Sequence, residues 1–222
     1  MNKIEQYNIN RKTNQPTQIF DILQKREDPY ISDYGTITDF YLSSSIGPAS
    51  DYIDWFQRIR AARESDIIRI HINCPGGDLF TTIQFMQVLS ETKATVVMSV
   101  EGACMSAASL LFLMGDEYLV TDHSVFLFHN YSGGVVGKGA EIYHGVVHER
   151  KWTERLLRSA YEGFLTDEEI SQLVEDKDVW MDSQTVISRL KERGIGKDKQ
   201  KSEIKKKTKT SRKKTTKNKK TK

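Results

Sequence analysis

Several features that would place a chain in a special class are scarce in this sequence. Only two of its 222 residues are cysteines, Cys74 and Cys104, which excludes a disulfide-stapled scaffold and favours the reducing cytoplasm. The strongest apolar run, from 109 to 114, is far shorter than the roughly 18 residues that a membrane span needs. The polar N-terminus lacks the apolar segment of a secretory signal. We therefore expect a soluble cytoplasmic protein with no membrane contact.

Metal-binding and nucleotide-binding patterns are lacking as well. His144 and His148 are four residues apart in a predicted helix but have no evident third ligand, so a solvated or interface role is favoured over a metal site. The glycine-rich stretch 133–139 contains a Gly-Lys pair, but neither its spacing nor its next residue fits a P-loop. The chain is therefore expected to bind no ATP, no metal and no other cofactor.

The formal net charge of +3 conceals two parts of opposite sign. Residues 197–222 contain 14 lysines and arginines against 2 acidic residues, a net of +12, which leaves −9 for the rest of the chain. Such a segment cannot bury enough apolar surface to fold alone. We interpret 197–222 as a disordered basic tail. Contact with nucleic-acid phosphates and docking on an acidic surface of a neighbouring subunit remain as alternatives.

The remaining chain divides into a polar arm and one domain. Residues 1–33 are weakly periodic, with one short possible helix at 19–24, and indicate a flexible or partner-dependent arm. Strands and helices alternate over 34–196, which predicts an α/β fold. The expected strands lie at 39–42, 67–72, 94–100, 118–120 and 124–128. The expected helices begin at 50 and 167 or cover 79–89, 106–114, 140–161 and 184–193.

Within this domain, three segments contain the residue types of a serine hydrolase. Ser106 stands where a predicted buried strand turns through small residues into a buried helix, which exposes its hydroxyl at the helix N-terminus. There the N–H of Ala107 and the helix dipole can stabilise developing negative charge. The Pro75-Gly76-Gly77 turn brings a second segment of backbone close to that point. His129 ends an apolar strand, which would hold a catalytic base in a rigid position. Each feature taken singly is more often only a cap, a turn or a structural histidine.

The order and spacing of these segments resemble the proteolytic subunits of Clp proteases. The string IHINCPGG at 70–77 is similar to the family's INSPGG turn, and residues 102–106 resemble its Gly-x-Ala-Ala-Ser nucleophile motif. Residues 125–129 resemble the apolar strand that ends in the family's catalytic histidine. Residues 178–181 are similar to its Asp-aromatic-aromatic-Met segment. The resemblance covers roughly Ile37 to Gly196, nearly all of the predicted domain.

The resemblance implies a role for each matching residue. Ser106 would attack the peptide bond, His129 would act as general base and then acid, and Asp178 would orient the imidazole. The N–H groups of Gly76 and Ala107 would form the oxyanion hole. Backbone at Gly77, Gly133 and Gly134 would bind the substrate, with the glycine pair starting a handle region and pairing with the peptide as an added strand.

A second serine competes for the role of nucleophile. The string Ala107-Ala108-Ser109 also copies Ala-Ala-Ser, which would make Ser109 the attacking residue. The ungapped spacing from the Pro-Gly-Gly turn, the position of Gly102 and the stop at Gly115 all favour Ser106. Ser109 would lie nearly one helical turn deeper.

The resemblance also implies a fold and an assembly. The fold would be a spiral of repeated β-β-α units, shared with crotonases, from which the helix at 140–161 protrudes as a handle. Subunits would form two stacked heptameric rings, a tetradecamer that encloses the active sites. An AAA+ unfoldase would feed protein substrates into this compartment, and the rings alone would cut short peptides.

Some departures from the family keep other functions open. Cys104 and Met105 replace two alanines of the nucleophile motif, and the arm at 1–33 does not match, so the choice of ATPase is open. A virus-encoded relative that processes scaffold or capsid proteins is one alternative, which genomic neighbours would distinguish. An inactive subunit of a mixed ring would be expected to lack a triad residue. A crotonase-type thioester enzyme would leave His129 and Asp178 without a role.

Overall fold

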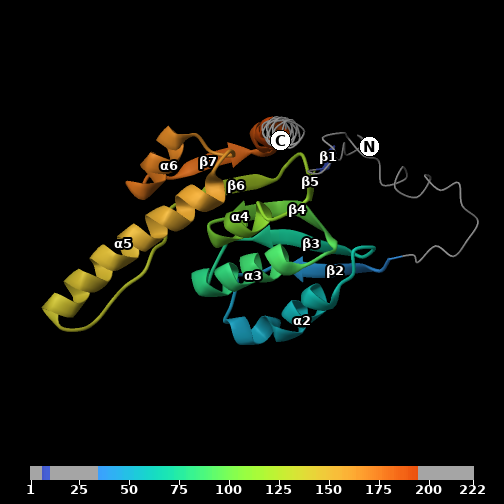
Figure 1. Ribbon diagram of the computed structural model, residues 1–222. Helices are drawn as coiled ribbons and strands as arrows, with labels where there is room; N and C mark the ends of the chain where they lie inside the picture. Colours follow the sequence, from blue (N-terminus) through green and yellow to red (C-terminus); the bar gives the residue numbers. More distant parts are fainter. Residues whose placement is uncertain (1–6, 11–34, 195–222) are drawn as a thin grey trace, which may run out of the picture.

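A mixed α/β body surrounds one sheet, and a long helix projects from it (Figure 1). The computed structural model describes residues 7–10 and 35–194. In the described part, β2, β3, β4 and β5 are parallel neighbours in that order, and β1 pairs antiparallel with β5. β6 pairs parallel with the end of β4 and antiparallel with β7. The strands are β1 (Tyr7–Asn10), β2 (Ile37–Leu42), β3 (Ile67–Cys74), β4 (Thr95–Met105), β5 (Glu117–Val120), β6 (Val125–Phe128) and β7 (Val179–Asp182).

From β2 to α4, helices alternate with strands along the chain. The helices are η1 (Ala49–Tyr52), α2 (Ile53–Ala61), α3 (Leu79–Glu91), α4 (Ala107–Phe112), α5 (Gly139–Tyr161) and α6 (Asp167–Val174), and residues 183–194 are also helical. α5 extends beyond the body as the expected handle does (Figure 1). None of the helices described is long and apolar enough to cross a membrane. The predicted α/β class with its protruding helix is therefore confirmed.

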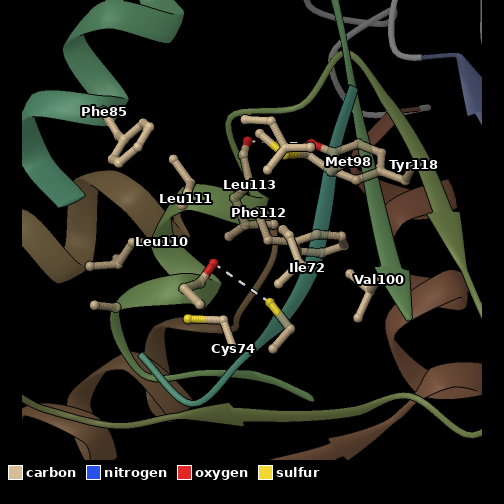
Figure 2. Packing of buried hydrophobic residues seen from close by; sticks show 14 of the residues in the cluster. Ile72, Cys74, Phe85, Met98, Val100, Leu110, Leu111, Phe112, Leu113 and Tyr118 are labelled. Carbon is tan, nitrogen blue, oxygen red and sulfur yellow. Dashed lines mark hydrogen bonds between the residues drawn. The ribbon is translucent and has the colours of Figure 1, made fainter. Parts of the chain in front are cut away.

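Burial of one face of the sheet explains the main core. Alternate residues of β3 are buried, among them Ile72, and they pack with Val100 of β4 beneath α3 and α4. α4 is buried over its whole length, and Leu111 lies near Phe85 of α3 (Figure 2), while Phe112 packs against Tyr118 with the ring centroids 4.9 Å apart. This core fixes the ends of β3 and β4, where the candidate site lies.

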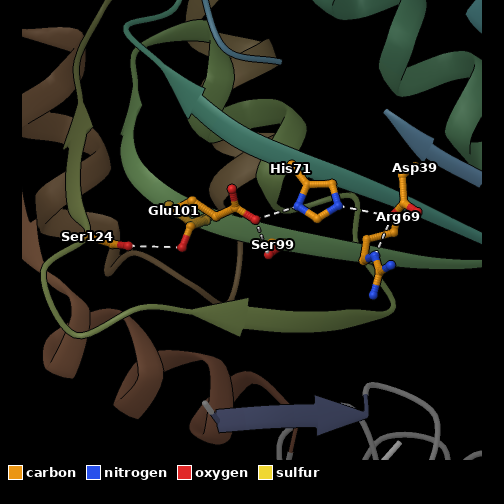
Figure 3. A network of polar contacts seen from close by, with 7 residues as sticks. Asp39, Arg69, His71, Ser99, Glu101 and Ser124 are labelled. Carbon is orange, nitrogen blue, oxygen red and sulfur yellow. Dashed lines mark hydrogen bonds and ion pairs between the residues drawn. The ribbon is translucent and has the colours of Figure 1, made fainter. Parts of the chain in front are cut away.

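The other face of β2, β3 and β4 carries a polar network (Figure 3). Arg69 Nε lies 2.5 Å from Asp39 Oδ1, and this hydrogen bond lowers the pKa of Asp39 to about 2. His71 contacts the same carboxylate at 3.0 Å and, on its other side, Glu101. Tyr41 stacks on the His71 ring with the ring centroids 4.5 Å apart. Ion pairs thus replace apolar packing on this side of the sheet.

Some predicted boundaries differ from those of the structure. β4 continues to Met105 instead of ending near Val100, because Ala103 to Met105 pair with β6. β7 was not predicted as a strand. Within the predicted arm, Tyr7–Asn10 forms β1, whereas the possible helix at 19–24 and the tail at 197–222 lie outside the described residues. The division into arm, domain and tail stays a prediction.

An ion pair that fastens α6 to the helix at 183–194 predicts a pH-dependent loss of stability. Arg189 donates two hydrogen bonds of 2.6 and 2.7 Å to Glu169, which lowers the pKa of Glu169 from its ordinary 4.5 to about 2. This contribution is complete above pH 4.5 and is lost as the pH falls towards 2. Glu169→Gln should therefore lower the melting temperature at pH 7, and the difference from wild type should shrink by pH 3.

The matched control is Glu154→Gln, which alters an exposed pair with Arg158 one helical turn away in α5. Exposed pairs of this kind contribute only about 0.3–0.5 kcal/mol, so its melting temperature should stay close to wild type at both pH values. Equal melting-temperature losses for the two variants at pH 7 would contradict the assignment of this stabilisation to Glu169.

Candidate active site

The candidate nucleophile occupies the tight connection between β4 and α4. Ser106 has φ 55° and ψ −129°, in a region that residues with a side chain seldom adopt. Its N–H donates to the carbonyl of Leu127 in β6 at 2.8 Å, so the neighbouring strand holds the turn. Its side chain is partly exposed. The next residue, Ala107, begins α4, and its N–H belongs to the set that has no acceptor within the helix.

The competing serine lies in a different environment. Ser109 is fully buried, with 0% exposure. Its hydroxyl donates to the carbonyl oxygen of Ser106 at 2.7 Å and contacts Tyr161 Oη of α5 at 2.8 Å. Burial raises the pKa of the Tyr161 hydroxyl well above its ordinary value, so this phenol stays neutral. The geometry gives Ser109 a structural role in joining α4 to α5.

The Pro-Gly-Gly turn lies so close to Ser106 that it leaves no room for a side chain at Gly76. A Cβ at Gly76 would lie 2.6 Å from Ser106 Cβ, and the glycine has φ +103°. Any side chain here would collide with the turn that carries Ser106, so glycine is required by space as well as by conformation. The expected juxtaposition of this turn with Ser106 is present in the structure.

Hydrogen bonds in this turn distinguish its two glycine N–H groups. Gly76 N–H donates to the buried Cys74 Sγ at 3.4 Å, and Gly76 O accepts from Ile46 N–H at 2.8 Å. In a trans peptide the C=O and the following N–H point in opposite directions. Gly77 N–H therefore points away from Ile46, and it makes no hydrogen bond with the residues described. The sequence pattern gave no sign that a thiol would engage the first N–H.

Strand pairing places the candidate base beside the candidate orienting carboxylate. β6 and β7 pair Phe128 with Val179, so the next antiparallel position sets His129 against Asp178. Both residues line a cavity of about 760 Å³. His129 Nε2 is buried there and has no hydrogen-bond partner in the described part of the chain. No hydrogen bond joins His129 to Ser106 or Asp178 among the described residues.

A second carboxylate lies in the same cavity. Asp176 has φ 60° and accepts a 2.8 Å hydrogen bond from Asn130 Nδ2. This bond ties the residue after His129 to the turn that leads into Asp178. The sequence pattern did not predict this pair, although the closely spaced aspartates at 176 and 178 offered a signal.

Two of the glycines expected to bind substrate, Gly133 and Gly134, line the same cavity. Glu149 and Arg150 of α5 line it together with them. Residues 129–138 form no strand, and a Cβ at Gly134 would meet no atom within 4 Å. The segment is open and can accept the backbone of an extended peptide.

The two cysteines lie beneath this site and are free. Cys74 and Cys104 are buried and stand opposite each other where β3 and β4 pair. Burial raises the pKa of both thiols, most strongly for Cys104, so neither is activated as a nucleophile. In residues 7–10 and 35–194, no group of three or more His, Cys, Asp or Glu side chains is placed to hold a metal ion.

Comparison with protein families adds an independent finding to this geometry. The family model described as Clp protease matches residues 48–189, which is more than half of the chain. The matched range includes the Pro-Gly-Gly turn, the β4–α4 connection, the end of β6 and β7.

Proposed function

Because the chain belongs to the Clp protease family, we propose that it is a serine endopeptidase in which Ser106, His129 and Asp178 form the catalytic triad. The observation that carries the proposal is the β4–α4 turn. A strained, partly exposed serine lies against a glycine turn there and precedes the first N–H of a buried helix. Such a turn is typical of an activated nucleophile with oxyanion donors around it.

The residues have distinct roles in the proposed reaction. Ser106 Oγ attacks the carbonyl carbon as His129 takes its proton, and the carbonyl oxygen becomes an oxyanion. His129 then gives this proton to the departing amine, which leaves an acyl-enzyme. Water, deprotonated by His129, attacks the acyl carbon, the bond to Ser106 Oγ breaks, and His129 returns the proton to Ser106 as the acid product departs. Asp178 holds the imidazole in one orientation and stabilises its protonated form.

Two backbone N–H groups stabilise the oxyanion in this proposal. Ala107 N–H is one of them, at the start of α4. For the other we favour Gly77 over the Gly76 that the family resemblance implies. The support is that Gly76 N–H is engaged by Cys74, whereas Gly77 N–H points away from Ile46 and makes no hydrogen bond with the residues described. Gly77, Gly133 and Gly134 are proposed to contact the substrate backbone.

The triad is proposed to close when substrate binds or when subunits assemble. Catalytic hydrogen bonds are often long or misaligned without substrate and tighten in the complex. The unpaired Nε2 of His129 supports this, because a buried polar atom without a partner is costly and favours a state that supplies one. Ser106 Oγ is the partner that the reaction needs.

The projecting helix α5 supports a self-assembled enzyme. Tyr143, Val146 and Val147 are exposed on it, and Val136 is fully exposed just before it. We propose that these apolar side chains pack against other copies of the chain in two stacked heptameric rings. An AAA+ ATPase in the cytoplasm is the proposed source of unfolded substrates.

The test is active-site labelling of the assembled full-length protein with a fluorophosphonate probe, followed by mass mapping of the modified residue. We expect one label per subunit, on Ser106, together with cleavage of short peptides. Native mass spectrometry of the same sample reports the ring size. An assembled protein that neither labels nor cleaves would overturn the peptidase and favour an inactive structural subunit.

A further inference from the structure

Phe80 is exposed in a way that sets it apart from the other phenylalanines. Its exposure is 73%, whereas each of the other seven phenylalanines described is at most 5% exposed. A ring left in water forgoes the free energy that burial would give. A single exposed apolar residue needs no special explanation, so its surroundings decide its meaning.

The backbone brings Phe80 to the edge of the candidate active site. Gly76, four residues earlier, lies against Ser106. Gly77 is fixed by its bridge to Ile46, and Asp78 caps α3 by accepting from Thr81 N–H at 2.6 Å. Phe80 therefore stands in a firmly held first turn of α3, close to the proposed nucleophile.

A second aromatic side chain, from α5, lies against Phe80. Trp152 of α5 stacks on Phe80 with the ring centroids 5.7 Å apart and the ring planes 24° apart. The same helix contributes Glu149 and Arg150 to the cavity that contains His129. α5 thus extends from the His129 cavity to the beginning of α3 (Figure 1). The stacked pair thus connects the first turn of α3, which follows the turn beside Ser106, with the helix that lines the His129 cavity.

We propose that Phe80 and Trp152 form an aromatic subsite that binds an aromatic side chain of the substrate beside the scissile bond. The proposal rests on the peptidase function and specifies its preference. Contact between rings is expected to favour an aromatic residue over an aliphatic one of similar size by roughly two- to tenfold. Loss of the whole apolar contact, as with alanine in the substrate, is expected to cost about tenfold or more in kcat/KM.

The experiment measures kcat/KM of the assembled full-length enzyme on two peptide panels. One panel carries Phe, Leu or Ala immediately before the scissile bond, and the other carries them immediately after it. We expect wild type to prefer Phe in one panel. Phe80→Ala and Trp152→Ala should each lower the Phe-to-Ala ratio in that panel about tenfold, and the double variant should lose little more. Labelling of Ser106 should be unchanged.

Conservative variants separate a subsite from a structural contact. Phe80→Leu keeps an apolar side chain against α5, so it should lower the Phe-to-Leu ratio while preserving assembly. Trp152→Phe keeps the stack and should retain the preference. Tyr41→Ala removes another exposed, stacked aromatic residue, on β2, and should leave every ratio unchanged.

The two proposals fail in different ways. Substrate ratios that stay at wild-type values in Phe80→Ala and Trp152→Ala, with Ser106 still labelled, would overturn the subsite alone. A general loss of kcat/KM on all peptides, with unchanged ratios, would do the same and make the pair a structural contact. Absence of labelling and cleavage in wild type would overturn the peptidase and the subsite together.

Discussion

Ser106→Ala is expected to abolish peptide cleavage and fluorophosphonate labelling while leaving the fold intact. Removal of a triad nucleophile lowers kcat by roughly six orders of magnitude, so the remaining rate should fall below detection. The side chain is partly exposed at a turn and makes no hydrogen bond with the residues described, so little stability depends on it. Melting curves and native mass spectra should therefore match those of wild type.

Ser109→Ala is the matched control, because it removes a hydroxyl only three residues further along the chain, within α4. It should keep the label on Ser106 and most of the activity but lose stability. Without its hydroxyl, the buried Tyr161 Oη loses its partner, at a cost of about 1–3 kcal/mol. For a chain of this size, each kcal/mol lost lowers the melting temperature by roughly 2–4 °C.

The two variants together decide the nucleophile. A Ser109→Ala protein that is stable and unlabelled, beside a Ser106→Ala protein that still labels, would reverse the assignment. Loss of the label in both, with normal assembly, would mean that the hydroxyl of Ser109 is needed to hold the β4–α4 turn.

Local patterns in the sequence were sufficient for the parts of the fold that depend on near neighbours. The apolar strand 67–72 and the helix at 79–89 were predicted from their spacing, and the structure contains both as β3 and α3. The long helix α5 begins within one residue of its expected start. Periodicity indicates which face of an element is buried, and in these elements the buried residues do recur at the spacing of a strand or a helix.

Features that depend on distant residues could not be read in the same way. The end of β4 contains glycine and alanine, which rarely favour a strand, and it is held extended by pairing with β6 and, at Cys104, with β3. The contact between Ser109 and Tyr161 joins residues 52 positions apart. The bond from Gly76 N–H to Cys74 depends on the course of the turn. None of these leaves a periodic signal, so the fine geometry of the site required the structure.

Asp178→Asn is expected to lower kcat by about four orders of magnitude with little change in KM. An asparagine keeps the shape of the side chain but can hold the imidazole in the wrong tautomer, and it cannot stabilise the protonated ring. Asp178 is exposed on the edge of the cavity, so the folded state should not suffer. Steady-state kinetics on a short peptide, with melting curves as a check on folding, measure the effect.

Asp176→Asn tests whether the correct carboxylate has been chosen. It lies two residues earlier, lines the same cavity and accepts the hydrogen bond of Asn130. An asparagine can still accept this bond through its amide oxygen, so the turn should persist and kcat should change by less than about tenfold. Antiparallel pairing sets Asp178, and not Asp176, opposite His129. If Asp176→Asn is instead the inactive variant, the turn must rearrange in the assembled enzyme so that Asp176 orients the imidazole.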